Sequence, residues 1–186
     1  MAELFQKSGR ACVAGVEVLR WRISLPMRGE AIAAFYEEIG RRAVAFCERA
    51  LREHAEQAFA LSDNENKRFS FPAFSYRLEG RVTYEDEEVL SVCLTAELRR
   101  RGERSCLGFF EQGQVFEKKS GLLLPPEEVV SLFGGTRLSA KEKRSPKGVL
   151  LSQDGVLLHD GNEWKKKEVS TRKTEKNSCN GGENMV

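Results

Sequence analysis

The sequence predicts an α+β fold in which one long amphipathic helix packs on an antiparallel sheet, with a short second helix and a C-terminal hairpin. A change of pattern along the chain supports this prediction. Apolar residues recur with the helical period across residues 30–61, and from residue 69 to residue 98 they recur with the period of two that strands show. A helix followed by a run of strands is an order typical of the α+β class.

The first expected element is a strand within residues 11–25. Apolar and polar side chains alternate from Val16 onward, and the alternation slips at Arg20–Trp21, which indicates a β-bulge. Pro26 ends this strand. Residues 1–10, which precede it, are expected to form a flexible N-terminus.

The helix predicted over residues 30–61 has the strongest pattern in the chain. One face is apolar and the opposite face is charged, and at 1.5 Å per residue the helix is ~45 Å long. Its apolar face is expected to bury Phe35, Ile39 and Phe46 against the strand residues Leu90, Val92 and Leu94.

Strands are predicted on both sides of an acidic turn at residues 85–88. Pro72 suits an edge strand, and the alternation over residues 89–98 gives the second strand one apolar face. A hairpin is then expected from Cys106–Phe110 and Gln114–Glu117, joined by a turn at residues 111–113.

The remaining elements are short. A helix is predicted from Pro126, with acidic residues in its first turn and Gly134-Gly135 at its end, and residues 134–147 are expected to be a loop or frayed helix. The Asp154-Gly155 pair predicts a hairpin over Val149–His159. We expect this hairpin to be the terminal ribbon of the sheet, where its open edge would support self-association or the addition of a partner strand.

The chain length of 186 residues indicates a single domain, expected at residues 11–164, and leaves open its division into two lobes at 11–84 and 85–164. The net charge of +2 arises in the tail, since residues 165–186 hold six basic and three acidic residues. We expect this basic tail to be disordered. The rest of the chain is balanced in charge, which argues against a nucleic-acid partner.

The cysteines indicate a reducing compartment. Five widely spaced cysteines without a C-x-x-C motif are typical of reduced thiols, and a disulfide between Cys93 and Cys106 is the alternative. The first ten residues hold no apolar signal-peptide stretch, and no apolar run reaches the ~18 residues of a membrane span. A cytoplasmic protein is therefore expected from the residues alone.

No catalytic, cofactor-binding or metal-binding residue is predicted. His54 and His159 have no second ligand at metal-binding spacing, and Ser152 and Asp160 lie near His159 only along the sequence. The acidic turn lacks the spacing of a calcium loop, and no glycine-rich phosphate motif occurs. Arg99–Arg101 is interpreted as a solvated loop.

Four sequence segments together resemble the domain of unknown function of RsiV-type anti-sigma factors. They are RISLPMRGEAIAAFYEEIGRRA, YRLEGRVTYEDEEVLSVCL, GQVFEKKSGLLLPPEEVVSLF and VLLSQDGVLLHDG, in the family's order over residues 12–162. The resemblance implies an extracytoplasmic domain without chemistry of its own, found in lysozyme-sensing anti-sigma factors and beside peptidoglycan deacetylases. It also implies a cell-wall or lysozyme-type ligand.

The chain departs from that family in three places. The family's tGGAHG loop reads RRRGERS at residues 99–105, a lysine-rich tail stands where closing strands are expected, and no membrane anchor or sigma-binding region precedes the domain. The resulting hypothesis is a non-enzymatic binding or sensing module for a protein or cell-wall component. The alternatives are an enzyme with an unrecognised hydrolase-type site, or a binder of nucleic acid or an anionic surface that uses the basic tail.

Overall fold

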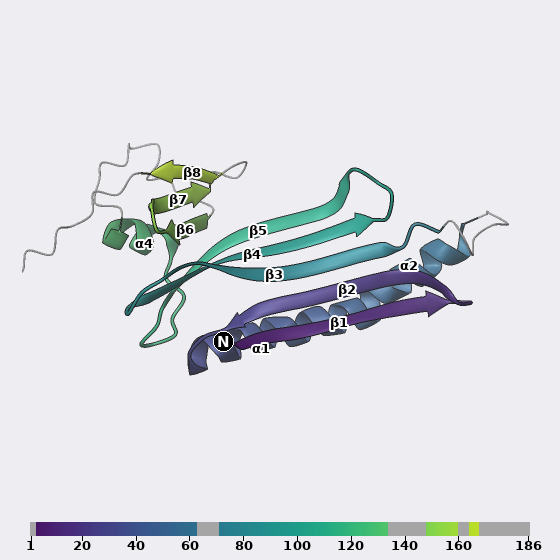
Figure 1. Cartoon of the computed structure of the whole chain (residues 1–186), viewed down its shortest axis with the longest axis horizontal. Coiled ribbons are helices and arrows are strands. Elements are labelled where there is room, and N and C mark those ends of the chain that lie inside the picture. The colour runs from purple at the N-terminus through teal and green to yellow at the C-terminus, as the bar shows by residue number, and fades with distance from the viewer. Residues whose placement is uncertain (1–2, 63–70, 134–147, 160–163, 168–186) are drawn as a thin grey trace, which may run out of the picture.

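The computed structural model describes residues 3–62, 71–133, 148–159 and 164–167, which form a five-stranded sheet, a three-stranded sheet and the helices that cover them (Figure 1). The strands are β1 (Glu3–Val13), β2 (Val16–Met27), β3 (Phe74–Glu85), β4 (Val89–Arg100), β5 (Cys106–Glu117), β6 (Gly148–Ser152), β7 (Gly155–His159) and β8 (Trp164–Lys167). The helical segments are α1 (Glu30–Phe46), the π-helical turn η1 (Cys47–Leu51), α2 (Arg52–Ala60) and α4 (Pro126–Phe133). The α+β prediction, with one long and one short helix, is confirmed.

The large sheet has the strand order β1-β2-β3-β4-β5 and is antiparallel except between β2 and β3. These two strands run parallel, with Leu19 beside Phe74 and Ile23 beside Leu78, because the long helix returns the chain to its starting end between them. The predicted antiparallel sheet therefore contains one parallel pair.

The long helix runs without a break from α1 through η1 to α2 and packs against β1 and β2. It begins after Gly29, whose φ of 64° lies in the left-handed region that favours glycine. Its buried stripe follows the helical period and comprises Ile32, Tyr36, Gly40, Cys47, Leu51 and Ala55.

The main core lies between this helix and the sheet. The rings of Phe35 and Tyr36 pack edge-to-face on Phe116, with centroids 5.3 Å and 5.7 Å away. The Tyr36 hydroxyl donates a 2.8 Å hydrogen bond to Oε1 of Gln114, a buried polar side chain on β5. Phe116 and Tyr36 are fully buried, so they fix the helix against the strands.

A second, smaller core lies on the opposite face of the large sheet, at one end. There β6, β7 and α4 cover Val89 and Val115. The buried Ser91 hydroxyl accepts hydrogen bonds from the Leu151 N–H and the Thr83 hydroxyl, both at 2.9 Å, so its burial is satisfied. The small sheet is thus joined to the large one by apolar packing and by a buried hydrogen bond.

Several sequence-based expectations need correction. Residues 3–10 are not a flexible N-terminus, because they form most of β1 and pair with β2. The hairpin expected around residues 111–113 does not exist, because β5 runs unbroken from Cys106 to Glu117. The bulge was predicted at Arg20–Trp21. The register instead shifts between Ala11 and Cys12, which lie nearer the β1–β2 turn.

Two packing expectations also differ from the structure. Phe46 is 46% exposed and stacks on Tyr76 of β3, because this end of α1 packs mainly over β2. Phe35 and Ile39 are partly buried at the margin of the main core. The aromatic side chain that the helix buries fully is therefore Tyr36, whereas the sequence predicted burial of Phe35 and Phe46.

The C-terminal hairpin is not the terminal ribbon of a sheet. The edge of β7 pairs with β8, with His159 opposite Trp164, and β6 is buried against the large sheet. The domain thus continues past the expected boundary at residue 164, through Lys167. Residues 134–147, expected to be a loop or frayed helix, and the tail residues 168–186 lie outside the described residues.

Candidate binding face

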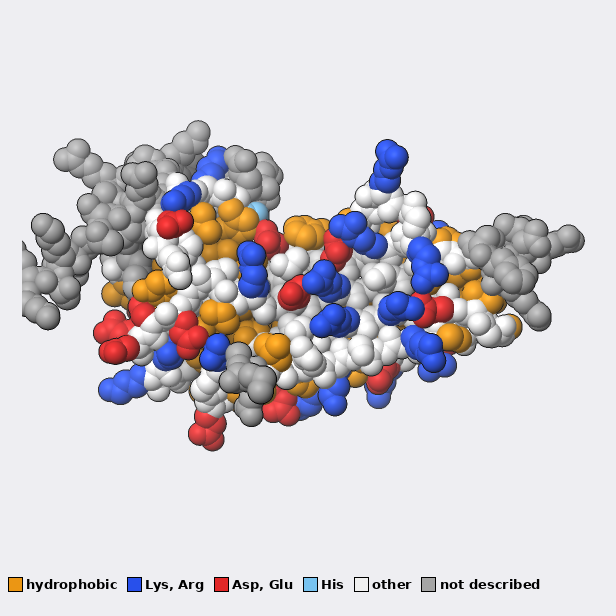
Figure 2. Space-filling model, viewed as in Figure 1, with side chains coloured by type: hydrophobic (Ala, Val, Ile, Leu, Met, Phe, Trp, Pro, Cys, Tyr) orange, Lys and Arg blue, Asp and Glu red, His pale blue; other side chains and the backbone are white. Residues whose placement is uncertain are grey.

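The five-stranded sheet has one face that is largely open. The long helix covers the other face, and the small sheet covers only one end of this one (Figure 1). Along β1 to β4 the side chains of the open face alternate with those of the main core. Its arginines, which we call the arginine face, are exposed and comprise Arg10, Arg20, Arg22, Arg77, Arg81 and Arg99. Figure 2 shows basic side chains gathered over these strands with acidic ones between them.

Pairs of these arginines lie directly beside each other across neighbouring strands. Arg10 on β1 is opposite Arg20 on β2, and Arg22 on β2 is the register partner of Arg77 on β3. Like charges in directly opposite positions destabilise a sheet. The open face therefore sets arginines side by side across strands at two places.

Carboxylates neutralise part of this face. Arg20 pairs with Glu17 at 2.9 Å, and this hydrogen bond raises the pKa of the guanidinium above its ordinary value. Arg77 pairs with Glu79 at 2.6 Å.

The other arginines of the face divide into one paired residue and three without a carboxylate. Arg99 pairs with Glu97. Arg10, Arg22 and Arg81 form no ion pair with any residue that the structure describes. Part of the positive charge on this face is thus not neutralised by the described carboxylates.

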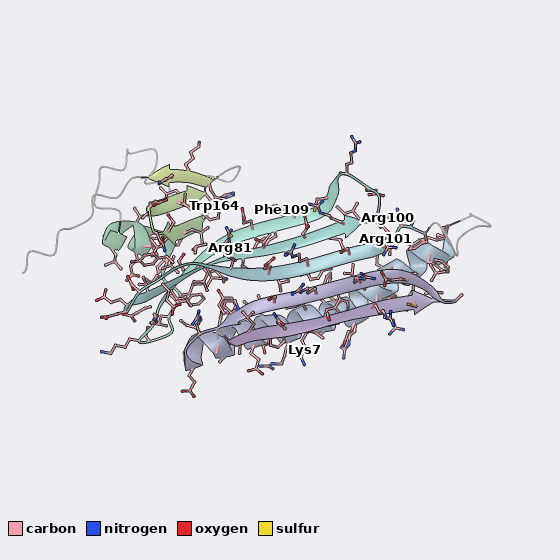
Figure 3. All side chains as sticks on the ribbon, viewed as in Figure 1. Lys7, Arg81, Arg100, Arg101, Phe109 and Trp164 are labelled. Atoms are coloured by element: carbon pink, nitrogen blue, oxygen red, sulfur yellow. The ribbon has the colours of Figure 1, made fainter. Side chains whose placement is uncertain are left out.

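The small sheet borders the arginine face at one end. The indole N–H of Trp164 on β8 donates a 2.6 Å hydrogen bond to Glu111 on β5, and the Cys93 thiol donates to the other oxygen of that carboxylate at 3.4 Å. Burial, and then the Glu111 charge, raise the pKa of the Cys93 thiol. Arg81 is the register partner of Cys93, so it lies at the foot of this border (Figure 3).

The loop between β4 and β5 borders the face at its other end. Arg101 reaches Glu17 at 3.2 Å, and the Arg100 guanidinium lies over the rings of Phe71 and Phe74 at 5.7 Å and 5.2 Å. Figure 3 shows both arginines at this end of the sheet. The run expected to be a solvated loop therefore carries specific contacts, with Arg101 at the open face and Arg100 on the helix-covered face beside its register partner Phe74.

The histidines singled out in the sequence lie on separate elements. His54 on α2 packs its ring against Phe74 at 5.3 Å, and His159 on β7 packs against Trp164 at 4.8 Å. The Ser152 hydroxyl donates to the carbonyl of Gly155, and Asp160 lies outside the described residues.

The acidic turn at residues 85–88 closes the β3–β4 hairpin. Asp86 accepts hydrogen bonds from the backbone N–H groups of Glu88 and Val89 and from the Tyr84 hydroxyl. Burial opposes ionisation of Asp86, but these hydrogen bonds outweigh it and lower the pKa of the carboxyl. Within the described part of the chain, no group of three histidine, cysteine, aspartate or glutamate side chains is placed to hold a metal ion.

The cysteine geometry excludes a disulfide between Cys93 and Cys106. Cys93 is the register partner of Gly113, whereas Cys106 is the partner of Arg99, six residues further along β4. That separation is about 20 Å along a strand, far beyond the ~7 Å limit between the α-carbons of a disulfide. Cys12, Cys47, Cys93 and Cys106 are free thiols.

The arginine face forms no sequence motif and leaves no net charge, so neither predicts it. The signal that could have predicted it is arginine at alternate or near-alternate strand positions, as at Arg20 and Arg22 and again at Arg77 and Arg81. This spacing places each pair on one face of its strand.

The chain matches no protein-family model and no curated protein sequence. Two similar solved structures are crystal structures of DUF3298 family proteins. The one from Pseudomonas aeruginosa PAO1 has a TM-score of 0.46 and 11% sequence identity, over 85% of this chain and 81% of that chain. The one from Bacteroides fragilis has a TM-score of 0.45 and 13% identity, over 85% of this chain and 82% of that chain.

None of the helices among the described residues combines the length and the apolar composition needed to cross a membrane.

Proposed function

We propose that this chain is a non-enzymatic protein-binding module and that its arginine face binds an acidic protein segment. The carrying observation is that Arg10 and Arg22 have no carboxylate partner among the described residues, although each is the register partner of another arginine, Arg20 and Arg77 respectively. Arg20 and Arg77 already pair with Glu17 and Glu79, so the unneutralised charge of each pair belongs to Arg10 or Arg22, and an acidic partner would neutralise it. A surface that served only solubility would have no need for adjacent like charges.

The carboxylates on the same face favour a protein over a nucleic acid. Glu79 and Glu97 lie between the arginines and would repel a continuous row of phosphates. A protein segment can place acidic residues over Arg10 and Arg22 and basic or neutral residues over these glutamates. The resemblance to RsiV-type domains adds a cell-wall component as a second ligand to test.

The charged groups of this face also favour binding over catalysis. Most are arginines and glutamates in ion pairs, and these hold a fixed pattern of charge. Both described histidines pack against aromatic rings away from this pattern.

The test is a titration of the full chain against a fluorescein-labelled deca-glutamate peptide, followed by fluorescence anisotropy at low salt. The Arg10→Gln/Arg22→Gln variant is expected to bind at least tenfold more weakly, about 1.4 kcal/mol. The control is Lys7→Gln/Arg49→Gln. It removes the same charge from exposed positions elsewhere, since Lys7 is the register partner of the core residue Ile23 and Arg49 lies on the helix.

Three results would contradict the proposal. Equal losses in the two variants would show attraction by net charge alone. Tighter binding of a single-stranded DNA of equal charge would indicate a nucleic-acid partner. Co-sedimentation with insoluble peptidoglycan that depends on Arg10 and Arg22, without binding of the peptide, would assign the face to the cell-wall ligand.

A further inference from the structure

Phe109 places a large apolar ring on the open face of the large sheet. It is the register partner of Glu97, which in turn is the register partner of Arg77. Side chains directly opposite each other on neighbouring strands point to the same side, so the ring stands on the arginine face. Phe109 is 62% exposed, although the side chains next to it on this face are charged.

A hollow of about 270 Å³ opens beside this ring. It is lined by Arg77, Glu79, Arg81, Thr95, Glu97 and Phe109. Thr95, the register partner of Glu79, has the shortest side chain of the six, so the longer side chains around it form the walls. In Figure 3, Phe109 and Arg81 lie on the stretch of the large sheet next to the small one.

The charges that line the hollow leave one cation without a carboxylate. Arg77 pairs with Glu79 at 2.6 Å, and Glu97 pairs with Arg99. Arg81 forms no ion pair with any residue that the structure describes. The hollow therefore combines an apolar ring with an excess of positive charge.

We propose that the acidic segment bound by the arginine face also carries an aromatic side chain, whose ring enters this hollow and packs against Phe109. This inference rests on the proposed function and specifies the composition of its partner. Two aromatic rings attract each other in offset or edge-to-face arrangements, and guanidinium groups such as those of Arg77 and Arg81 stack on aromatic faces. An aliphatic side chain would gain only from the removal of apolar surface from water. The lining therefore favours a ring.

One short segment can reach both the hollow and the unpaired Arg22. Arg22, Arg77, Glu97 and Phe109 are successive register partners from β2 to β5, so Phe109 lies three strands away from Arg22. Three strand spacings are about 14 Å, a distance that an extended segment covers in about four residues. Residues four positions apart lie on the same side of an extended segment. A glutamate over Arg22 and an aromatic residue four positions away would therefore both face the sheet.

The experiment compares three fluorescein-labelled decapeptides of equal charge by fluorescence anisotropy with the full chain. Each consists of glutamates with phenylalanine, leucine or alanine at the fifth position, which leaves a glutamate four positions away on both sides. The wild type is expected to bind the phenylalanine peptide about tenfold more tightly than the alanine peptide, with the leucine peptide between them.

Two neighbouring residues of β5 provide the variant and its matched control. Phe109→Ala should bind the phenylalanine and alanine peptides equally. Phe110→Ala should keep the preference, because Phe110 is 48% exposed but successive side chains of a strand point to opposite faces. Arg22→Gln should weaken the binding of all three peptides and leave the preference unchanged. Far-UV circular dichroism verifies that each variant is folded.

Failure of this inference and failure of the proposed function give different results. Equal binding of the three peptides, still dependent on Arg10 and Arg22, would overturn the aromatic partner and leave the proposed function standing. A leucine peptide that binds as tightly as the phenylalanine peptide would also overturn it, in favour of any apolar side chain. A preference that survives Phe109→Ala would remove the ring from this hollow. Binding of all peptides that is unaffected by Arg10→Gln/Arg22→Gln would overturn the proposed function and this inference together.

Discussion

Tyr36 shows how one side chain fixes the main core. Its hydroxyl donates to Gln114 Oε1 at 2.8 Å in a fully buried setting. Tyr36→Phe leaves that acceptor without its donor, so we expect the free energy of unfolding to fall by about 1–3 kcal/mol in urea titrations. The Tyr36→Phe/Gln114→Leu double variant should recover part of the loss. A single variant as stable as the wild type would contradict this account of the core.

The two phenylalanines of the core region should differ strongly in their contribution. Phe116 is fully buried, so Phe116→Ala is expected to cost about 3–5 kcal/mol of stability. Phe46 is 46% exposed, so Phe46→Ala should cost only about 1 kcal/mol. Urea unfolding of the two variants side by side checks this, and equal costs would mean that the helix packs differently on the sheet.

Buried thiols and hydroxyls make the fold sensitive to alkali. Burial raises the pKa of the Cys47 thiol from 9.0 to about 12, and burial also raises the pKa of Tyr36 well above its ordinary value. Above about pH 9 the unfolded chain loses the Cys47 proton and the folded chain keeps it, so stability falls as pH rises from 9 toward 12. The slope for one such group is at most about 1.4 kcal/mol per pH unit.

Comparison of urea unfolding at pH 8 and pH 10 checks this expectation. Cys47→Ala should lose less stability over this interval than the wild type, because it has no thiol to ionise. Equal losses in the two proteins would show that Cys47 titrates alike in the folded and unfolded chains.

At the scale of elements, Gly113 joins the two sheets. A side chain there would lie 2.1 Å from the Val149 carbonyl oxygen, a backbone atom that cannot move aside alone. Gly113→Ala should therefore displace β6 and lower stability by about 1–3 kcal/mol. Trp164 fluorescence, which reports the contact with Glu111, should change as well.

Gly108→Ala is the matched control on the same strand. The atom nearest to an added side chain there is the Leu98 β-carbon at 3.8 Å, an ordinary contact. Its stability should stay within about 0.5 kcal/mol of the wild type. Equal effects at the two glycines would show that the small sheet does not rest on β5.

Gly113 also explains why one element was predicted wrongly. The residues Glu111-Gln112-Gly113 have the composition of a turn, yet the chain continues straight because this glycine serves the close approach of another backbone. The helix was predictable because its pattern is local. By contrast, Gly9 of β1 lies against the Trp21 ring on β2. The pattern of residues along one strand does not reveal a contact with the neighbouring strand.

At the scale of the whole molecule, average composition conceals where the charge lies. Residues 1–164 are balanced in number of acidic and basic groups, and this balance argued for an uncharged body. The fold separates the charges, because strand alternation gathers arginines on the open face of the sheet. The candidate site therefore depends on strand register, which joins Arg22 of β2 to Arg77 of β3 across more than fifty residues of sequence.

The most direct test of the arginine face measures stability and binding in one variant, Arg22→Glu. The substitution replaces a repulsion beside Arg77 with an attraction, so the free energy of unfolding at low salt should rise by about 0.2–1 kcal/mol. The same variant should lose its affinity for the deca-glutamate peptide. A higher free energy of unfolding together with weaker peptide binding is the result expected if the arginines of this face serve to bind a partner at some cost in stability. A variant that is less stable than the wild type and binds the peptide equally well would contradict it.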